Sequence, residues 1–141
     1  MRVELSDEAR RLVALFEDEA GVTVRDCVVD EDHEQVVYMV KRGQMADAIG
    51  PGGQTVERVE EAIGRDVKLV EAAETAADFV ANALAPAAVY NVTVSENGDT
   101  VAYVEVAQAD RGAAIGSDGR NIDAARTLAK RHFGIDDIEL T

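Results

Sequence analysis

Two stretches of nine residues decide the fold of this chain: residues 48–56, AIGPGGQTV, and residues 114–122, AIGSDGRNI. Both read Ala-Ile-Gly-x-x-Gly-x-x-Val/Ile, and the second copy follows the first at an offset of 66 residues. Alternating apolar residues precede each copy, and a pattern of helical period follows it. A lone Gly-x-x-Gly arises often by chance, but two copies in one context indicate a duplicated module.

The first half of the chain predicts the order helix, strand, strand, short helix, glycine loop, helix, strand. The first helix is expected to begin after Ser6, whose hydroxyl can accept a hydrogen bond from a first-turn N–H, and to end at Gly21. The elements after it are expected over residues 22–29, 36–40, 44–49, 54–63 and 67–70, with the glycine loop at residues 50–53.

The second half of the chain repeats this order. Its elements are expected over residues 75–84, 89–95, 100–106, 110–115, 120–133 and 135–140, with the glycine loop at residues 116–119. Asn97 and Gly98 lie between two of these strands and predict a hairpin with a two-residue turn.

The repeat predicts an α+β protein of two domains, residues 1–72 and 73–141. Each domain has the order αββααβ and a three-stranded sheet packed against helices. The segment around residues 71–75 is short and contains no glycine or proline, so we expect the two domains to be rigidly joined.

The composition is strongly acidic. The chain has 28 acidic and 14 basic residues, a net charge of −14, and only three of the basic residues are lysines. A surface rich in Asp and Glu and poor in Lys is typical of proteins that work in molar salt, where screening tolerates self-repulsion. The alternatives are an acidic protein at ordinary salt or an acidic surface that binds a partner.

Several classes of protein are disfavoured. Cys27 is the only cysteine, so an internal disulfide is excluded, and its apolar neighbours predict that it is buried. Residues 1–8 are charged and do not resemble a secretion signal, and no run approaches 18 apolar residues, so we expect a cytoplasmic protein without a membrane span. His33 and His132 have neither a Cys partner nor a regularly spaced carboxylate that would indicate a metal site, and both are expected on the surface.

Motifs of nucleotide-dependent enzymes are missing from the sequence. Neither glycine loop is followed by the Lys-Ser/Thr of a phosphate-binding P-loop, and neither has the third glycine of a dinucleotide-binding loop. No set of residues has the pattern of a nucleophile and base or of an acid–base pair. The sequence therefore predicts a binding protein that is not an enzyme and needs no cofactor or metal.

The order of elements and the two loops resemble the K-homology (KH) family of RNA-binding domains, in the αββααβ arrangement called type II. Over nearly its whole length, the chain is similar to the archaeal family of NusA-type transcription termination factors, which consist of two tandem type II KH domains. The stretch from Ile115 to Ile122 is particularly similar to the second KH domain of that family. At 141 residues we expect no room for the polymerase-binding N-terminal domain or the S1 domain of bacterial NusA.

The resemblance implies a binding site for single-stranded RNA at each glycine loop. A KH loop clamps the backbone of about four nucleotides, glycines allow a close approach, and the N–H groups of the following helix face the phosphate. The RNA-binding residues implied by the resemblance and by nearby charge are Lys41, Arg42, Ile49, Gly50, Pro51, Gly52, Gly53, Gln54 and Arg58 for the first loop, and Arg111, Ile115, Gly116, Ser117, Asp118, Gly119, Arg120, Asn121, Arg126 and Lys130 for the second.

The two loops are not equivalent in sequence. Pro51 removes one N–H donor from the first loop, and Asp118 places a negative charge inside the second. Residues 110–134 nevertheless hold five basic and three acidic residues, a net charge of +2, whereas residues 1–34 carry −7. This charge distribution predicts one RNA surface in which the second domain binds more strongly.

The resemblance implies a protein that acts in transcription termination or in the control of elongation, as a monomer, with RNA polymerase or another transcription factor as a further partner. The alternative is a KH-fold scaffold on RNA polymerase or a ribosomal component, with weak RNA binding.

Overall fold

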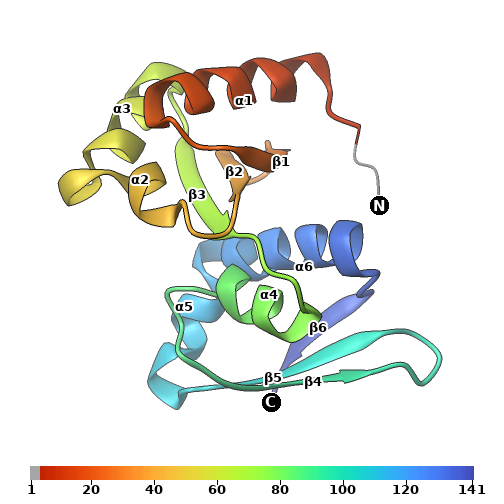
Figure 1. The fold of residues 1–141 in the computed structure, drawn as a ribbon. Helices are drawn as coiled ribbons and strands as arrows, with labels where there is room; N and C mark the ends of the chain where they lie inside the picture. The colour runs from red at the N-terminus through yellow and green to blue at the C-terminus, as the bar shows by residue number, and fades with distance from the viewer. Residues whose placement is uncertain (1–3) are drawn as a thin grey trace. The chain divides into compact units, whose positions relative to one another are not determined.

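The computed structural model describes residues 4–141, which form two compact units with a boundary between Ala72 and Ala73 (Figure 1). The first unit contains α1 (Asp7–Ala20), β1 (Val24–Asp30), β2 (Gln35–Val40), α2 (Met45–Ile49), α3 (Gln54–Ile63) and β3 (Asp66–Glu71). A single 3₁₀ turn, η1 (Pro51–Gly53), lies between α2 and α3. The predicted order of elements is confirmed, with boundaries that differ by one or two residues.

The sheet of the first unit has the order β1-β2-β3. β1 and β2 are antiparallel and joined by a tight turn, and β2 and β3 are parallel because two helices separate them along the chain. The central strand, β2, is buried along its whole length. Figure 1 shows α1 above one face of this sheet.

The predicted start and end of α1 are confirmed. Ser6 Oγ accepts a hydrogen bond of 3.1 Å from the N–H of Ala9, and Gly21 ends the helix in the left-handed conformation. Asp7 and Glu8 occupy the first turn, where carboxylates interact favourably with the helix dipole.

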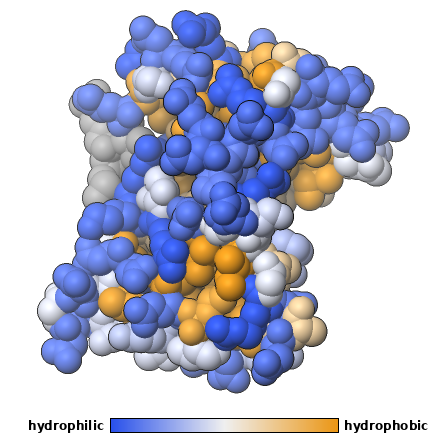
Figure 2. All heavy atoms as spheres, turned by 180° about the vertical axis from the view of Figure 1, so that it is seen from behind, coloured by the Kyte–Doolittle hydropathy of each residue, from blue (hydrophilic) through white to orange (hydrophobic). Residues whose placement is uncertain are grey.

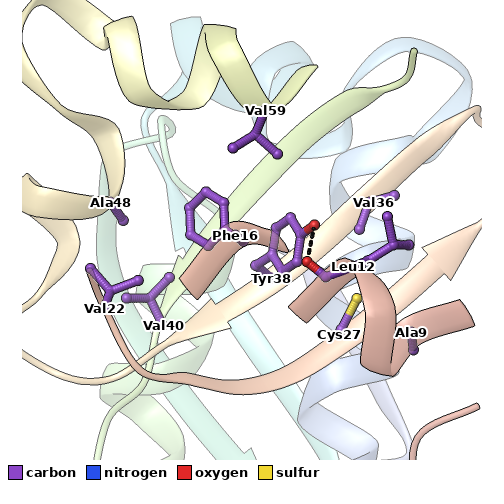
Figure 3. Close-up of a cluster of buried hydrophobic side chains, with 10 residues drawn as sticks. All are labelled: Ala9, Leu12, Phe16, Val22, Cys27, Val36, Tyr38, Val40, Ala48 and Val59. Carbon is purple, nitrogen blue, oxygen red and sulfur yellow. Dashed lines mark hydrogen bonds between the residues drawn. The ribbon is translucent and has the colours of Figure 1, made fainter. Parts of the chain in front are cut away.

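Side chains from the helices and the sheet of the first unit meet in one apolar core (Figure 3). The rings of Phe16 and Tyr38 stack with centroids 4.5 Å apart. Burial raises the pKa of Tyr38, which stays protonated and donates a 2.9 Å hydrogen bond to the carbonyl oxygen of Leu12. Cys27 belongs to the same core, as its sequence context predicts.

The second unit repeats this architecture. It contains α4 (Ala76–Ala83), β4 (Val89–Ser95), β5 (Val101–Val106), α5 (Arg111–Ile115), α6 (Arg120–Phe133) and β6 (Asp137–Leu140), with the 3₁₀ turns η2 (Gln108–Asp110) and η3 (Ser117–Gly119). β4 pairs antiparallel with β5, and β5 pairs parallel with β6. Figure 1 shows α4 and α6 on one face of this sheet.

The two-residue turn predicted at Asn97 and Gly98 is wrong. The last pair of the ladder is Ser95 with Val101, so five residues form the loop between β4 and β5. A two-residue turn would have placed Glu96 opposite Asp99, and like charges in facing positions destabilise a sheet. In the structure, Asp136 holds Thr100 instead: the N–H of Thr100 donates to Asp136 Oδ2 at 2.9 Å, and the N–H of Asp136 donates to the carbonyl oxygen of Thr100 at 2.7 Å.

The prediction that His33 is a surface residue is also wrong. Its side chain is only 12% exposed and lies in the turn between β1 and β2, where Nδ1 is 2.8 Å from Asp30 Oδ2. Gln35 donates to the same carboxylate at 3.1 Å. His132 is half-buried, with its ring 6.3 Å from that of Phe79.

Candidate nucleic-acid interface

The two glycine loops have the same backbone conformation, although their sequences differ. The φ angles are 78°, 59° and 79° at Gly50, Gly52 and Gly53, and 79°, 58° and 78° at Gly116, Asp118 and Gly119. The third position of each loop is therefore left-handed, a conformation that glycine adopts freely and that Asp tolerates better than most residues. The loops are duplicates in geometry as well as in sequence.

The first glycine of each loop packs against the helix that follows. A Cβ atom at Gly50 would lie 2.1 Å from Thr55 Oγ1, and one at Gly116 would lie 2.8 Å from both the backbone nitrogen and the Cβ of Asn121. Neither distance is compatible with a side chain. The first glycine is therefore required by the fold of the loop itself.

The second glycine of each loop faces open space. A Cβ at Gly53 would meet no atom within 4 Å, and one at Gly119 would meet only the Asp123 carboxylate, at 3.4 Å. The surface beside this glycine is therefore free for a ligand to approach the backbone. The motif by itself suggests that both glycines allow the backbone conformation and leave room for a ligand. In the structure, the first glycine is needed for packing within the loop, and the second leaves open space beside the backbone.

The helices that follow the loops begin without a side-chain cap. Gly53 precedes α3 and Gly119 precedes α6, and neither helix start has a side-chain hydrogen bond. The first N–H groups of a helix have no partner within the helix and carry a partial positive charge. The first of these groups is bonded inside the 3₁₀ turn that precedes each helix: the N–H of Gln54 donates to the carbonyl oxygen of Pro51, and that of Arg120 to the carbonyl oxygen of Ser117. The next N–H groups of the first turn lie beside the open glycine, where an anion can approach them.

A groove of about 470 Å³ opens beside the loop of the second unit. α5, the loop, α6 and β6 line it with Arg111, Ile115, Gly119, Ile122, Asp123, Arg126, Glu139 and Leu140. Its volume lies within the range typical of sites for small organic groups. The groove therefore has both apolar and charged side chains in its lining.

Two isoleucines of the repeated motif are exposed in the same way. Ile49 and Ile115 are each 40% exposed, whereas large apolar side chains are mostly buried elsewhere among the described residues. Figure 2 shows that most of the face in view is hydrophilic and that apolar residues gather in patches. Ile115 lines the groove, while Ile122, three residues beyond the loop, is buried beneath it.

Arg126, expected to contact RNA, is bonded to the protein. Its guanidinium lies 3.1 Å from Asp123 Oδ1 and 2.9 Å from Asp137 Oδ1. Its Nη2 also donates a 3.0 Å hydrogen bond to the carbonyl oxygen of Ile138. These contacts tie α6 to β6 and shape the groove wall.

The other cations expected near the second loop also have protein partners. Arg111 Nη1 donates to the carbonyl oxygen of Thr141 at 2.9 Å. Lys130 Nζ lies 2.5 Å from Asp136 Oδ1, and this hydrogen bond and charge raise the pKa of Lys130 and lower that of Asp136. Lys130 is not among the residues that line the groove.

In the first unit, the structure places Arg58 away from the glycine loop. Its Nε is 2.9 Å from Glu19 Oε1 on α1. The hollow beside this pair, about 440 Å³, is lined by α1 and α3 and contains no loop residue. Lys41 and Arg42 are exposed after β2.

Three of the groove residues were not predicted from the sequence: Asp123, Glu139 and Leu140. Ile122 was singled out as the last position of the motif, but not as an RNA-binding residue. Asp123 lies on the first turn of α6, after the loop, so the helical period could have found it. Those on β6 reach the groove only through the parallel pairing of β5 and β6. No local signal reports that pairing.

Among residues 4–141, no helix is long and apolar enough to cross a membrane, and no group of three or more His, Cys, Asp or Glu residues is arranged to hold a metal ion.

Comparisons with known proteins agree with this architecture. The family model of the KH domain matches residues 10–80, and the model of the NusA-like second KH domain matches residues 76–141. The chain is 60% identical over 141 residues to the probable transcription termination protein NusA of Halobacterium salinarum, with 100% of both chains covered. It is 61% identical over 140 residues to the protein of the same name from Halococcus morrhuae, with 99% of each chain covered.

More distant relatives match over nearly the whole of this chain. The probable NusA protein of Methanococcus vannielii is 36% identical over 141 residues, which cover 99% of this chain and 80% of that relative. The structure of this chain also resembles the crystal structure of APE1850, with a TM-score of 0.83 and a sequence identity of 30%. The match covers 97% of this chain and 100% of the APE1850 chain. With two tandem KH domains, matched loops and full-length relatives in halophiles, this chain belongs to the family of NusA-type transcription termination proteins.

Proposed function

We propose that this protein binds single-stranded RNA at its two glycine loops and acts, in the cytoplasm and as a monomer, in the termination of transcription or in the control of elongation. RNA polymerase, or another transcription factor, is its further partner in this role. The observation that carries the RNA site is the pairing, in each unit, of an open second glycine with an uncapped helix start.

A phosphate fits this arrangement by charge and by shape. The first-turn N–H groups of α3 and α6 can donate to its oxygens, and no side chain at Gly53 or Gly119 obstructs the approach. In the second unit, the groove beside the phosphate offers Ile115 and Leu140 to the apolar faces of bases. Backbone donors and apolar contacts thus supply the binding, and few free cations are needed.

This mode of binding suits the acidic composition. In 1 M salt the Debye length is about 3 Å, so the net charge of −14 repels RNA only weakly under such conditions. Contacts at hydrogen-bond distance persist, because they act inside the screening length.

The test compares two substitutions at one position. Gly119→Asp adds a charge next to the expected phosphate, and Gly119→Asn adds a side chain of nearly the same size without the charge. Both place a non-glycine residue at a φ of 78°, so both share the same backbone strain. We expect Gly119→Asp to bind a short uridine-rich RNA roughly tenfold more weakly than Gly119→Asn in 2 M KCl, because its carboxylate repels the phosphate and weakens the charge-assisted hydrogen bonds from the backbone N–H groups.

Changes in the NMR chemical shifts of the backbone amides during the same titration locate the RNA-binding site. RNA binding predicts shifts centred on residues 50–56 and 116–122 of the unsubstituted protein. Equal affinity of the two variants, or shifts that avoid both loops while the protein still associates with RNA polymerase, would favour the scaffold over the RNA-binding protein.

A further inference from the structure

The charged side chains that line the groove of the second unit differ in whether they are bonded to other protein atoms. Arg111, Asp123 and Arg126 are all bonded to protein atoms, as described above. Glu139 is exposed on β6 and, among the described residues, its side chain takes part in no hydrogen bond or ion pair. Its carboxylate is therefore the charged group of the groove that is available to a ligand.

A carboxylate only accepts hydrogen bonds and repels phosphate, so the ligand group beside Glu139 must be a donor. Among the RNA bases, guanine alone has two adjacent donors on one edge, N1–H and the N2 amino group. In adenine and cytosine the amino donor lies next to an acceptor nitrogen, and in uracil the single N–H lies between two carbonyl oxygens. A carboxylate facing those edges would meet an acceptor as well as a donor.

We propose that Glu139 forms a guanine subsite in the groove of the second unit, with its two carboxylate oxygens accepting from N1–H and N2–H of one base. Ile115 and Leu140 lie beside it and contact the apolar faces of that base. Parallel pairs of this kind are charge-assisted and specific in geometry. The subsite rests on the proposed RNA binding and adds a base preference to it.

The first unit does not share this subsite. In the parallel ladders Glu139 pairs with Tyr103, and the residue 66 positions before Tyr103 is Val37, whose partner is Lys68. Lys68 therefore occupies the register position of Glu139, with the opposite charge. A lysine donates and does not accept, so the guanine preference belongs to the second unit alone.

The experiment uses uridine octamers with a single guest base: guanine, adenine, cytosine or inosine, which is guanine without its N2 amino group. Each is titrated into the full chain in 2 M KCl and followed by the methyl signals of Ile115, Ile122 and Leu140. We expect the guanine octamer to bind roughly tenfold more tightly than the other three, since a bidentate pair discriminates by about that factor or more.

Two variants assign the preference to the side chain. Glu139→Gln should bind all four octamers within about threefold of one another, because one of the two acceptors becomes a donor. Glu105→Gln removes an exposed carboxylate from the neighbouring strand β5, outside the groove, and should keep the preference for guanine.

Equal binding of the four octamers by the unsubstituted protein would overturn the subsite, as would a guanine preference that persists in Glu139→Gln. Uniform weakening of all four octamers in that variant would also count against it. A failure of every octamer to shift the groove signals would overturn the RNA-binding proposal itself and the subsite with it.

Discussion

At the level of single residues, the two glycines of each loop have different roles. Gly116 packs against the backbone and side chain of Asn121, while Gly119 borders open space. The motif therefore combines one residue that the fold requires with one that leaves room for a ligand.

This division predicts unequal effects on stability. Gly116→Ala should lower the free energy of unfolding by more than about 3 kcal/mol, because overpacking adds to the strain of a left-handed residue. Gly119→Ala should cost only about 1–2 kcal/mol, the backbone strain alone. Urea unfolding in 2 M KCl measures both, and equal losses would contradict the separation of roles.

Asp118 has the same backbone conformation as Gly52 but adds a carboxylate to the second loop. Asp118→Asn keeps a residue that tolerates positive φ and removes the charge. We expect it to raise RNA affinity roughly two- to fivefold, the size of an exposed charge interaction in screening salt. Titration of the same octamers measures the change, and a decrease in affinity would show that the carboxylate helps binding.

At the level of elements, the turn between β1 and β2 is held by Asp30. Burial by itself would raise the pKa of this carboxyl, but hydrogen bonds from His33 and Gln35 outweigh it and hold the pKa below the usual 3.8. A lowered pKa stabilises the fold above the unfolded-state value, and this stabilisation is lost as the pH falls through the folded-state value.

The acid sensitivity of the turn can be measured by substitution. Between pH 6 and pH 3, Asp30→Asn should lose about 1 kcal/mol less stability than the unsubstituted protein, because it has no ionised carboxylate to protonate. Asp32→Asn, an exposed position in the same turn, is the control and should lose as much as the unsubstituted chain. Urea unfolding at the two pH values gives the comparison.

At the level of the whole molecule, RNA affinity should depend weakly on salt. The groove contains two arginines, and backbone N–H groups supply the remaining polar contacts that we propose. Two cationic contacts predict a slope of log K against log salt no steeper than about −1.4, so affinity should fall less than roughly tenfold between 0.5 and 2 M KCl. A much steeper slope would mean that more lysines and arginines reach phosphates than the structure indicates.

Much of the fold could be predicted because its signals are local. Ser6, Gly21, Gly64 and Gly134 mark the ends of helices through hydrogen bonds and backbone angles within a few residues. The order αββααβ followed from such signals and from hydrophobic periodicity. The prediction of a two-residue turn at Asn97 was wrong because the conformation of this loop depends on Asp136. Asp136 bonds Thr100 and lies 39 positions after Asn97 in the chain.

The candidate site also has some features that local sequence signals predict and others that depend on distant contacts. The loops and the exposed Ile49 and Ile115 were found from the repeated motif, since the motif carries its own geometry. The partners of Arg126 and the presence of Glu139 in the groove were not found, because both depend on how β6 pairs with β5 and packs against α6.

The sequence by itself determined the duplication, the order of elements and the position of the two loops, because each is encoded within a window of a few residues. Only the tertiary structure decided which glycine borders open space, which cations are already bonded and which carboxylate lines the groove. The glycine contacts lie within one loop and the helix that follows it, and they depend on the exact backbone angles there. The bonds from Arg126 to β6 and the place of Glu139 in the groove depend on segments further apart in the chain, whose contacts are settled by strand register and packing.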